Sequence, residues 1–392
     1  MATIDALLRE LVERASTPPE RATGLPPALY RSAELFELER ERIFATDWLC
    51  PGRSADVPKP GDYLTFSIND QPLFVVRGAD GAIRAFSNVC LHRMTRLLVG
   101  SGNCRHIACP YHGWTYDLSG RLVGAPHMNR TPAFDTGAMR LPAIRTELWE
   151  GWIYVTLNPD AVSIGRQLAP LGEVVGRYAM ADYVPLAVQD YVWNTNWKTL
   201  VENGFEGYHL PVAHRKTVGT GFPMTDTEFP AHSHDAFSFQ VFSKDETSRY
   251  GIAHPSNKRL EGRWRSTSVL PFVYPAHMYV LAPDLMWYLS IRPKALGQVH
   301  VRLGITAAPE VMASVGDRDA FARERLAFFD EVCAEDRAIV EGIYENLSAP
   351  LARPGRMSWL ERGLHEFFGY LARRLAGWSG EAARGPTLRV AS

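Results

Sequence analysis

The sequence predicts an α+β protein of two domains, a smaller β-rich domain followed by a larger one built on an antiparallel sheet and a long helix. Its 392 residues exceed what one hydrophobic core usually serves. Short aromatic and β-branched segments separated by turns fill residues 41–160, which favours a small β-sandwich. Longer alternating segments and a helical pattern follow in residues 161–392. Residues 1–40 are expected to be helical and to pack on the second domain.

The N-terminal segment contains two expected helices. Residues 3–15 alternate apolar and charged side chains at helical spacing, and Ser32 is a suitable N-cap for a second helix over 32–44. The first helix lacks the basic start, apolar middle and small-residue cleavage site of a signal peptide. No apolar run is long enough for a membrane span, and the net charge of −1 includes no Lys/Arg block. We therefore expect a cytoplasmic protein without a membrane or nucleic-acid partner.

Two Cys/His pairs lie within the β-rich region, Cys90 with His92 and Cys109 with His112. Each pair offers one thiolate and one imidazole, and we expect the two ligand loops to meet at one end of the sandwich. Such a ligand set suits either one tetrahedral zinc ion or a two-iron cluster. The cysteines outside the pairs are expected to remain free thiols in a reducing compartment; they are Cys50, Cys104 and Cys333.

The second domain is expected to combine long antiparallel strands with one long helix. Residues 274–281, 286–293 and 298–306 have the alternation of half-buried strands, and the last two are joined by a turn at Ala295-Leu-Gly-Gln. A helical pattern covers residues 317–347. A curved sheet gripping this helix is the simplest packing of these elements.

A second possible metal site begins with His209 and His214. On an uninterrupted helix, residues five apart point about 140° away from each other, which is poor for a shared metal. Pro211 disfavours helix at Leu210, so we expect the helix that starts near Trp197 to end near His209 and His214 to return from the next turn. Two imidazoles and one carboxylate would leave three open positions on ferrous iron. The alternative is a pair of histidines satisfied without a metal.

The carboxylate is expected to be Asp336. It falls on the apolar stripe of the long helix, four residues after Val332 and four before Val340. An isolated carboxylate facing the core is costly unless it is paired or bound to a metal, so a buried salt bridge is the alternative. The other acidic residues of this stretch fit a solvated face better; they are Asp330, Glu331, Glu335 and Glu341.

Glu206 precedes His209 by three residues, so on a helix both would share one face. A carboxylate there could accept a hydrogen bond from the ring N–H of a metal-bound histidine and orient the ring. The carboxylate could also face a subunit boundary and contact a histidine that holds the cluster of a neighbouring subunit. The alternative is a capping or surface glutamate.

Together these motifs resemble the α subunit of a Rieske non-haem iron oxygenase. The resemblance rests on Cys90 to Trp114, where Gly113-Trp114 follow the second pair, and on the stretch from Asn196 to His214. It implies an N-terminal Rieske β-sandwich domain plus a C-terminal helix-grip antiparallel-sheet catalytic domain. It also implies a homotrimer in which the cluster of one subunit supplies electrons to the iron of the next.

The resemblance assigns a role to each candidate residue. Both cysteines of the pairs would hold one iron of a [2Fe–2S] Rieske cluster and both histidines the other. The mononuclear Fe(II) would be bound by His209, His214 and Asp336, and Glu206 would be the bridging carboxylate between subunits.

Glu206 also points to a branch of the family. Many aromatic-ring dioxygenases of the family carry Asp at that position, and this chain is similar to the choline, betaine, carnitine and stachydrine oxygenases instead. The resemblance implies a terminal oxygenase component that takes electrons from a separate NAD(P)H-dependent flavin/ferredoxin-type reductase. With O2 it would hydroxylate an N-methyl group of a quaternary ammonium compound. The ammonium group could make cation–π contacts with aromatic side chains, whose alternative role is to pack in the hydrophobic core. The candidates are Phe205, Tyr274, Tyr279, Trp287 and Tyr288.

Two other functions stay open. The same machinery could hydroxylate a ring or remove an O-methyl group on an aromatic acid, which basic residues over the iron would favour. The chain could also be an electron carrier or a zinc-stabilised binding module without oxygenase activity.

Overall fold

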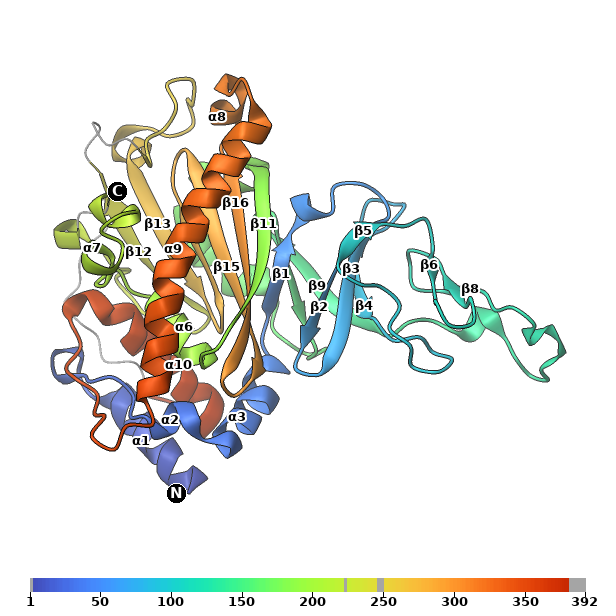
Figure 1. Ribbon diagram of the computed structural model, residues 1–392, viewed down its shortest axis with the longest axis horizontal. Coiled ribbons are helices and arrows are strands. Elements are labelled where there is room, and N and C mark those ends of the chain that lie inside the picture. Colours follow the sequence, from blue (N-terminus) through green and yellow to red (C-terminus); the bar gives the residue numbers. More distant parts are fainter. Residues whose placement is uncertain (1–2, 222–223, 245–249, 381–392) are drawn as a thin grey trace. The chain divides into compact units, whose positions relative to one another are not determined.

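The computed structural model describes residues 3–221, 224–244 and 250–380 (Figure 1). The chain divides into two compact units, one formed by Phe44–Gly165 and the other by Met1–Ile43 together with Arg166–Ser392. All three sheets of the described residues are antiparallel, and the described α-helices belong almost entirely to the larger unit, which confirms the predicted α+β class. Within the described residues, no helix combines the length and apolar character that crossing a bilayer requires.

The smaller unit consists of a seven-stranded sheet and a three-stranded sheet. Strand order in the larger sheet is β1-β10-β9-β4-β3-β2-β5, and the smaller one is β6-β7-β8. The strands are β1 Leu49–Arg53, β2 Asp62–Ile68, β3 Gln71–Arg77, β4 Ile83–Ser87, β5 Ser101–Asn103, β6 Ile107–Ala108, β7 Thr115–Tyr116, β8 Leu122–Gly124, β9 Ala143–Trp149 and β10 Trp152–Thr156.

The hydrophobic core of the smaller unit contains the cysteine of each Cys/His pair. Cys90 and Cys109 are buried in one cluster with Phe74, Phe86 and Trp114, and other apolar side chains complete it. This hydrophobic cluster therefore holds the loops that carry the Cys/His pairs in place, because the cysteine of each loop is packed in the core.

The larger unit is built on a six-stranded antiparallel sheet of order β11-β16-β15-β14-β13-β12. The strands are β11 Val184–Trp193, β12 Phe237–Ser243, β13 Thr267–Val273, β14 His277–Leu281, β15 Leu285–Ala295 and β16 Gln298–Ala307. The predicted hairpin turn is confirmed, since Ala295 pairs with Gln298. The 29-residue helix α9, Arg318–Asn346, lies across one face of this sheet (Figure 1).

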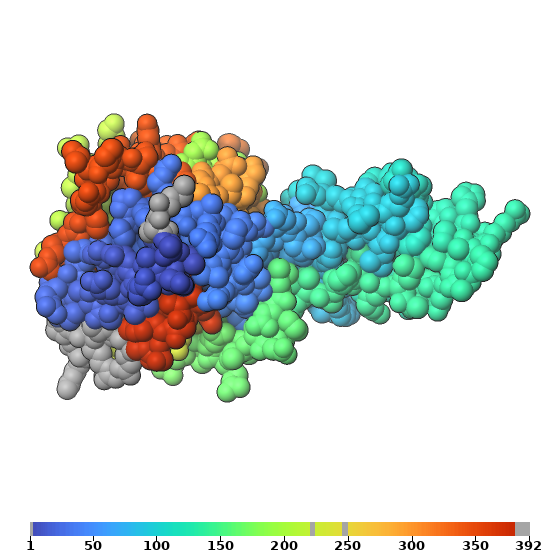
Figure 2. All heavy atoms as spheres, turned by 90° about the horizontal axis from the view of Figure 1, so that it is seen from below, coloured from blue at the N-terminus to red at the C-terminus, as the bar shows by residue number. Residues whose placement is uncertain are grey.

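Shorter helices complete the larger unit. They are α1 Ile4–Ser16, α2 Ala28–Arg31, α3 Ala33–Glu39, α4 Ile164–Gln167 where the chain passes from the smaller unit, α5 Ala169–Val175, α6 Trp197–Gly204, α7 Leu210–Ala213, α8 Pro309–Ser314 and α10 Arg362–Ala376. Helix α1 packs against α10, and Figure 2 shows these N-terminal (blue) and C-terminal (red) segments side by side. Ser32 caps α3 as predicted, because its side chain accepts a hydrogen bond from the N–H of Leu35.

The N-terminal helices bond to α6 through buried polar groups. Glu39 accepts hydrogen bonds from Lys198 and from the indole of Trp197, the latter at 2.6 Å. The Tyr30 hydroxyl lies 2.7 and 2.9 Å from the two carboxylate oxygens of Glu202. These bonds fix the start of the segment that continues to the two histidines.

Glu202 predicts a pH dependence of stability. Burial raises the pKa of Glu202 from 4.5 to about 8, although the Tyr30 hydrogen bond and the Lys198 charge oppose the rise and Glu361 reinforces it. Between these values the folded chain binds more protons than the unfolded chain, so stability falls as pH rises, by up to about 1.4 kcal/mol per pH unit from this group. Glu202→Gln stays neutral, so its apparent Tm should fall less over this window. Parallel Tm curves for both proteins would contradict this.

Candidate active site

The two Cys/His pairs lie on tight loops of the smaller unit. The Cys90 N–H donates to the carbonyl of Thr95 and the Cys109 N–H to that of Trp114, each at 2.8 Å. The imidazole rings of His92 and His112 lie 4.7 Å apart between centroids, and both residues are exposed while both cysteines are buried. The donor set fits a Rieske cluster, with two thiolates inside the unit and two imidazoles at its surface.

Tyr116 is a residue that the sequence did not single out. Its hydroxyl lies 3.4 Å from the sulfur of Cys90 and accepts a hydrogen bond from the N–H of Leu91 at 3.1 Å. Burial raises the pKa of Tyr116, so the hydroxyl stays protonated and can donate to a thiolate. Hydrogen bonds to cluster sulfurs are one of the factors that set reduction potential.

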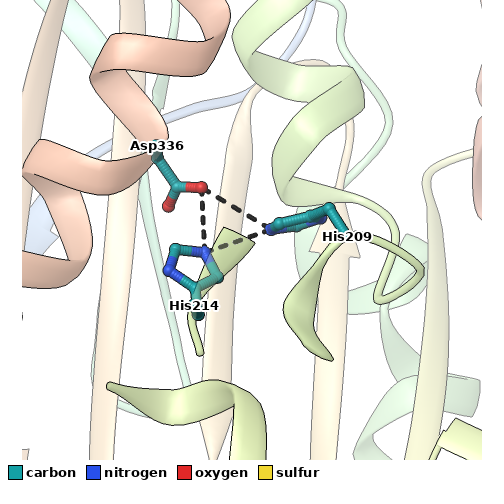
Figure 3. A group of neighbouring side chains, drawn as sticks. All are labelled: His209, His214 and Asp336. Atoms are coloured by element: carbon teal, nitrogen blue, oxygen red, sulfur yellow. Dashed lines mark hydrogen bonds and ion pairs between the residues drawn. The ribbon is translucent and has the colours of Figure 1, made fainter. Parts of the chain in front are cut away.

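His209, His214 and Asp336 converge in the larger unit (Figure 3). The Nε2 atoms of the two histidines are 3.2 Å apart, and one oxygen of Asp336 lies 3.0 Å from His214 Nε2 and 3.5 Å from His209 Nε2. One donor atom from each residue thus lies within 4.8 Å of the others. Two imidazoles and a carboxylate grouped in this way are the donor set of non-haem iron oxygenases.

The second ring nitrogen of each histidine is held by a carboxylate. His209 Nδ1 is 2.5 Å from an oxygen of Glu206, and His214 Nδ1 is 2.8 Å from an oxygen of Glu335. A carboxylate accepts the Nδ1 proton, which leaves the Nε2 lone pair free for a metal and fixes the ring orientation.

The local fold around His209 differs from the prediction. Helix α6 ends at Gly204, and His209 is the N-cap of the separate short helix α7, in which Pro211 lies in the first turn. The expected helix through His209 is therefore wrong: Pro211 begins a helix, where its missing N–H costs nothing, and does not end one. Glu206 contacts His209 through a loop, also accepting a hydrogen bond from the His209 backbone N–H at 3.1 Å.

Helix α9 presents Asp336 inward, as its spacing predicted. Asp336 is buried together with Val332 and Val340. One expectation about this helix is wrong. Glu335 does not lie on a solvated face, because its carboxylate bonds to His214 and also accepts a hydrogen bond from the Thr217 hydroxyl at 2.6 Å.

The close grouping of histidines and carboxylates shifts the pKa values of His209 and Asp336 in opposite directions. Burial lowers the pKa of His209, but hydrogen bonds and charge from Asp336 and Glu206 outweigh it and raise the pKa to about 10. Burial raises the pKa of Asp336, yet both histidines reverse this and lower it to about 2. A metal dication must displace the proton that His209 holds, so metal affinity should increase with pH.

A cavity of about 880 Å³ adjoins the centre. It shares Val218, Val280 and Trp287 with a small recess of about 30 Å³ that contains both histidines and Asp336. Of the five aromatic residues considered from the sequence, Trp287 lines this cavity, whereas Phe205 and Tyr274 stack in the core. The aromatic lining that sequence reasoning missed is Tyr250, Phe321, Phe328 and Phe329.

Comparison with known proteins agrees with this arrangement. The model of the ring-hydroxylating α-subunit catalytic domain matches residues 180–377. The chain belongs to the ring-hydroxylating α-subunit family. The model of the Rieske [2Fe–2S] domain matches residues 47–135. A protein of this family carries a Rieske [2Fe–2S] cluster and a mononuclear iron, and the two donor sets fit these groups.

Curated relatives of this family member are oxygenase subunits. The chain is 37% identical over 208 residues to the glycine betaine monooxygenase oxygenase subunit of Chromohalobacter salexigens, covering 53% of this chain and 46% of the relative. It is 35% identical over 208 residues to the carnitine monooxygenase oxygenase subunit of Escherichia coli K12, covering 52% and 55%. These alignments span about half the length of the relatives.

Longer matches come from a plant protein and a solved structure. Chloroplastic choline monooxygenase of Arabidopsis thaliana is 28% identical over 362 residues, covering 89% of this chain and 82% of the relative. The crystal structure of the quaternary ammonium Rieske monooxygenase CntA with an inhibitor has a TM-score of 0.79 at 24% identity, covering 92% of this chain and 98% of the other. This likeness shows that the chain described here has the Rieske oxygenase fold.

Proposed function

We propose that this chain is the terminal oxygenase component of a monooxygenase that hydroxylates an N-methyl group of a quaternary ammonium compound. The convergence of His209, His214 and Asp336 beside an aromatic-lined cavity carries this proposal. Electrons come from NAD(P)H through a separate flavin/ferredoxin-type reductase. One O2, two electrons and two protons convert N–CH3 to N–CH2OH and water. The product then releases formaldehyde and the demethylated amine.

The chain's residues hold the two metal groups. Cys90 and Cys109 bind one iron of the cluster, and His92 and His112 bind the other. His209, His214 and Asp336 bind the mononuclear iron, for which their grouped donor atoms are the support. When bound, the cluster supplies single electrons and the mononuclear iron supplies O2 activation.

Glu206 acts between the two groups. Its carboxylate orients His209 through the 2.5 Å contact at Nδ1. In a homotrimer, the same carboxylate also lies on the path by which electrons pass from the cluster of a neighbouring subunit to the mononuclear iron. The solved structure of a related quaternary ammonium Rieske monooxygenase gave insights into inter-subunit electron transfer in that protein, which supports this arrangement. We infer a cytoplasmic location, where a soluble reductase and reduced thiols are available.

The cavity favours a cationic, partly apolar substrate. Trp287 and Phe329 lie 5.4 Å apart between ring centroids and line the cavity next to the metal recess. Aromatic faces attract quaternary ammonium groups through cation–π interaction, and the relatives named above act on glycine betaine, carnitine and choline. Lys244 and Arg325 also line the cavity, which is the observation that favours an aromatic acid as the second candidate.

Oxygen uptake tests these alternatives directly. The chain, reconstituted with a surrogate reductase and NADH, is given choline, betaines and carnitine in one series and benzoate-type acids in another, with formaldehyde assayed in parallel. Uptake coupled to formaldehyde from the amines supports the proposal, and uptake only with the acids supports the second candidate. A reduced protein without a Rieske EPR signal would instead indicate a zinc-stabilised module.

Glu335 offers a separate test of the metal centre. Glu335→Gln removes the negative charge that fixes His214, so Fe(II) affinity should fall by about 10–100-fold. Anaerobic competition with a chromogenic chelator measures this. Glu331→Gln, an exposed position on the same helix, is the matched control. Equal affinities for the two variants would show that Glu335 does not support the iron ligand.

A further inference from the structure

The cavity extends away from the metal centre along β15. On one face of this strand Leu289 lines the metal recess, Trp287 lines both spaces and Leu285 lines the cavity, while Asp284 follows in the adjoining turn. These positions alternate as one strand face requires. At about 3.3 Å per residue, the five steps from Leu289 to Asp284 cover roughly 17 Å.

Helix α9 orders its side chains in the same direction. Asp336 lines the recess, and Phe329 and Arg325 line the cavity. Phe329 lies beside Trp287, which lines both spaces, whereas Arg325 lies over Tyr250, whose neighbour Gly251 bonds to Asp284. The 11 positions from Arg325 to Asp336 correspond to about 16 Å at 1.5 Å per residue. Two independent walls thus place the outer end of the cavity roughly 15 Å from the metal ligands. A volume of about 880 Å³ suits a molecule much larger than a single trimethylammonium group.

The charged side chains of the lining gather at this outer end. Arg325 bonds to Glu324, and Lys244 donates to a backbone carbonyl at 3.3 Å. Asp284 accepts one hydrogen bond, from a backbone N–H at 2.9 Å, and its other oxygen has no hydrogen-bond partner among the described residues. Burial raises the pKa of Asp284, although the Gly251 hydrogen bond and the charge of Lys244 oppose the rise, so the remaining rise reflects the cost of its charge there. A donor brought by a ligand would offset that cost.

We propose that Asp284 binds a hydrogen-bond-donating cationic head, such as a primary ammonium group, of an elongated substrate whose N-methyl end lies at the metal centre. The terminal torsion of an aspartate is soft, so its second oxygen can turn toward the cavity. The apolar and aromatic stretch between Asp284 and Trp287 then covers the body of the substrate. This inference rests on the proposed function and names the substrate class of the same site.

The test compares two series of trimethylammonium probes of increasing chain length, one ending in a primary amine and the other in a methyl group. For long probes, kcat/KM of the amine should exceed that of its methyl analogue by about 10-fold or more, mainly through KM. Asp284→Asn should remove most of this preference. Asp235→Asn, whose side chain is 90% exposed, is the control and should keep it.

Calorimetric measurement of the binding of the same probes distinguishes a failure of the Asp284 site from a failure of the proposed function. Asp284-dependent preference for the long amine without O2-dependent oxidation of any probe would overturn the proposed function and support the site. Turnover of trimethylammonium probes with no preference for the amine, in the wild-type chain or unchanged in Asp284→Asn, would overturn the site and leave the proposed function standing. The wild-type comparison needs no variant, so the proposal stays testable if Asp284→Asn does not fold.

Discussion

Replacing Asp336 with alanine is expected to abolish substrate oxidation while the Rieske cluster keeps its visible spectrum. The carboxylate is the only anionic donor among the three converging residues, and without it the two histidines alone face the metal. Loss of a supporting hydrogen bond typically costs 10–100-fold in metal affinity, so loss of a direct ligand should cost more than about 100-fold. Metal analysis should therefore find cluster iron but no mononuclear iron, and formaldehyde should not form.

The matched control for this variant is Asp330→Ala. Asp330 is an exposed aspartate on the same helix, and its side chain accepts a hydrogen bond from the Tyr191 hydroxyl. This control should retain both iron and turnover, because its loss affects only a surface contact. Full iron content in the Asp336 variant would exclude Asp336 as a ligand.

Glu206→Gln is expected to slow product formation by about 100-fold, although both metal groups remain bound. The amide keeps an oxygen that can accept the Nδ1 proton of His209, but it removes the negative charge at the position proposed to link cluster and iron. Outer carboxylates that orient metal-bound histidines contribute effects of this order. A single-turnover experiment measures the step directly: the pre-reduced cluster should reoxidise slowly when substrate and O2 are added.

Asp226→Asn is the control for this second variant. Asp226 is an exposed carboxylate in the same unit, and its replacement should leave the reoxidation rate unchanged. If Glu206→Gln reoxidised its cluster at the wild-type rate and formed product, the bridging role would be wrong. Iron analysis of the same sample separates a blocked electron path from loss of His209 as a ligand.

The candidate donor residues could be selected from the sequence because their signals are local. Each Cys/His pair spans only a few residues, and the loops that carry them are short. The inward position of Asp336 followed from the period of a 29-residue helix, which holds its register over many turns. The structure brings together His209, His214 and Asp336 as that pattern predicted, while their role as ligands stays a proposal.

The contact between Glu206 and His209 was predicted from a shared helix face, whereas in the structure a loop makes it. Pro211 signals a helix boundary, yet the same residue fits the first turn of a helix as well as the position after one. In the structure α6 packs against α9 and β15 and ends at Gly204. The loop that follows then brings the two side chains together.

What the sequence by itself determined is therefore the family and the α+β class, and it also named the candidate residues of the two proposed donor sets. Tertiary structure alone decided which side chains surround them. Glu335 contacts His214 across 121 positions of chain, and the cavity takes its aromatic lining from both β15 and α9. Such contacts leave no periodic or local signal, because they depend on how separate elements pack and not on the spacing within any one of them.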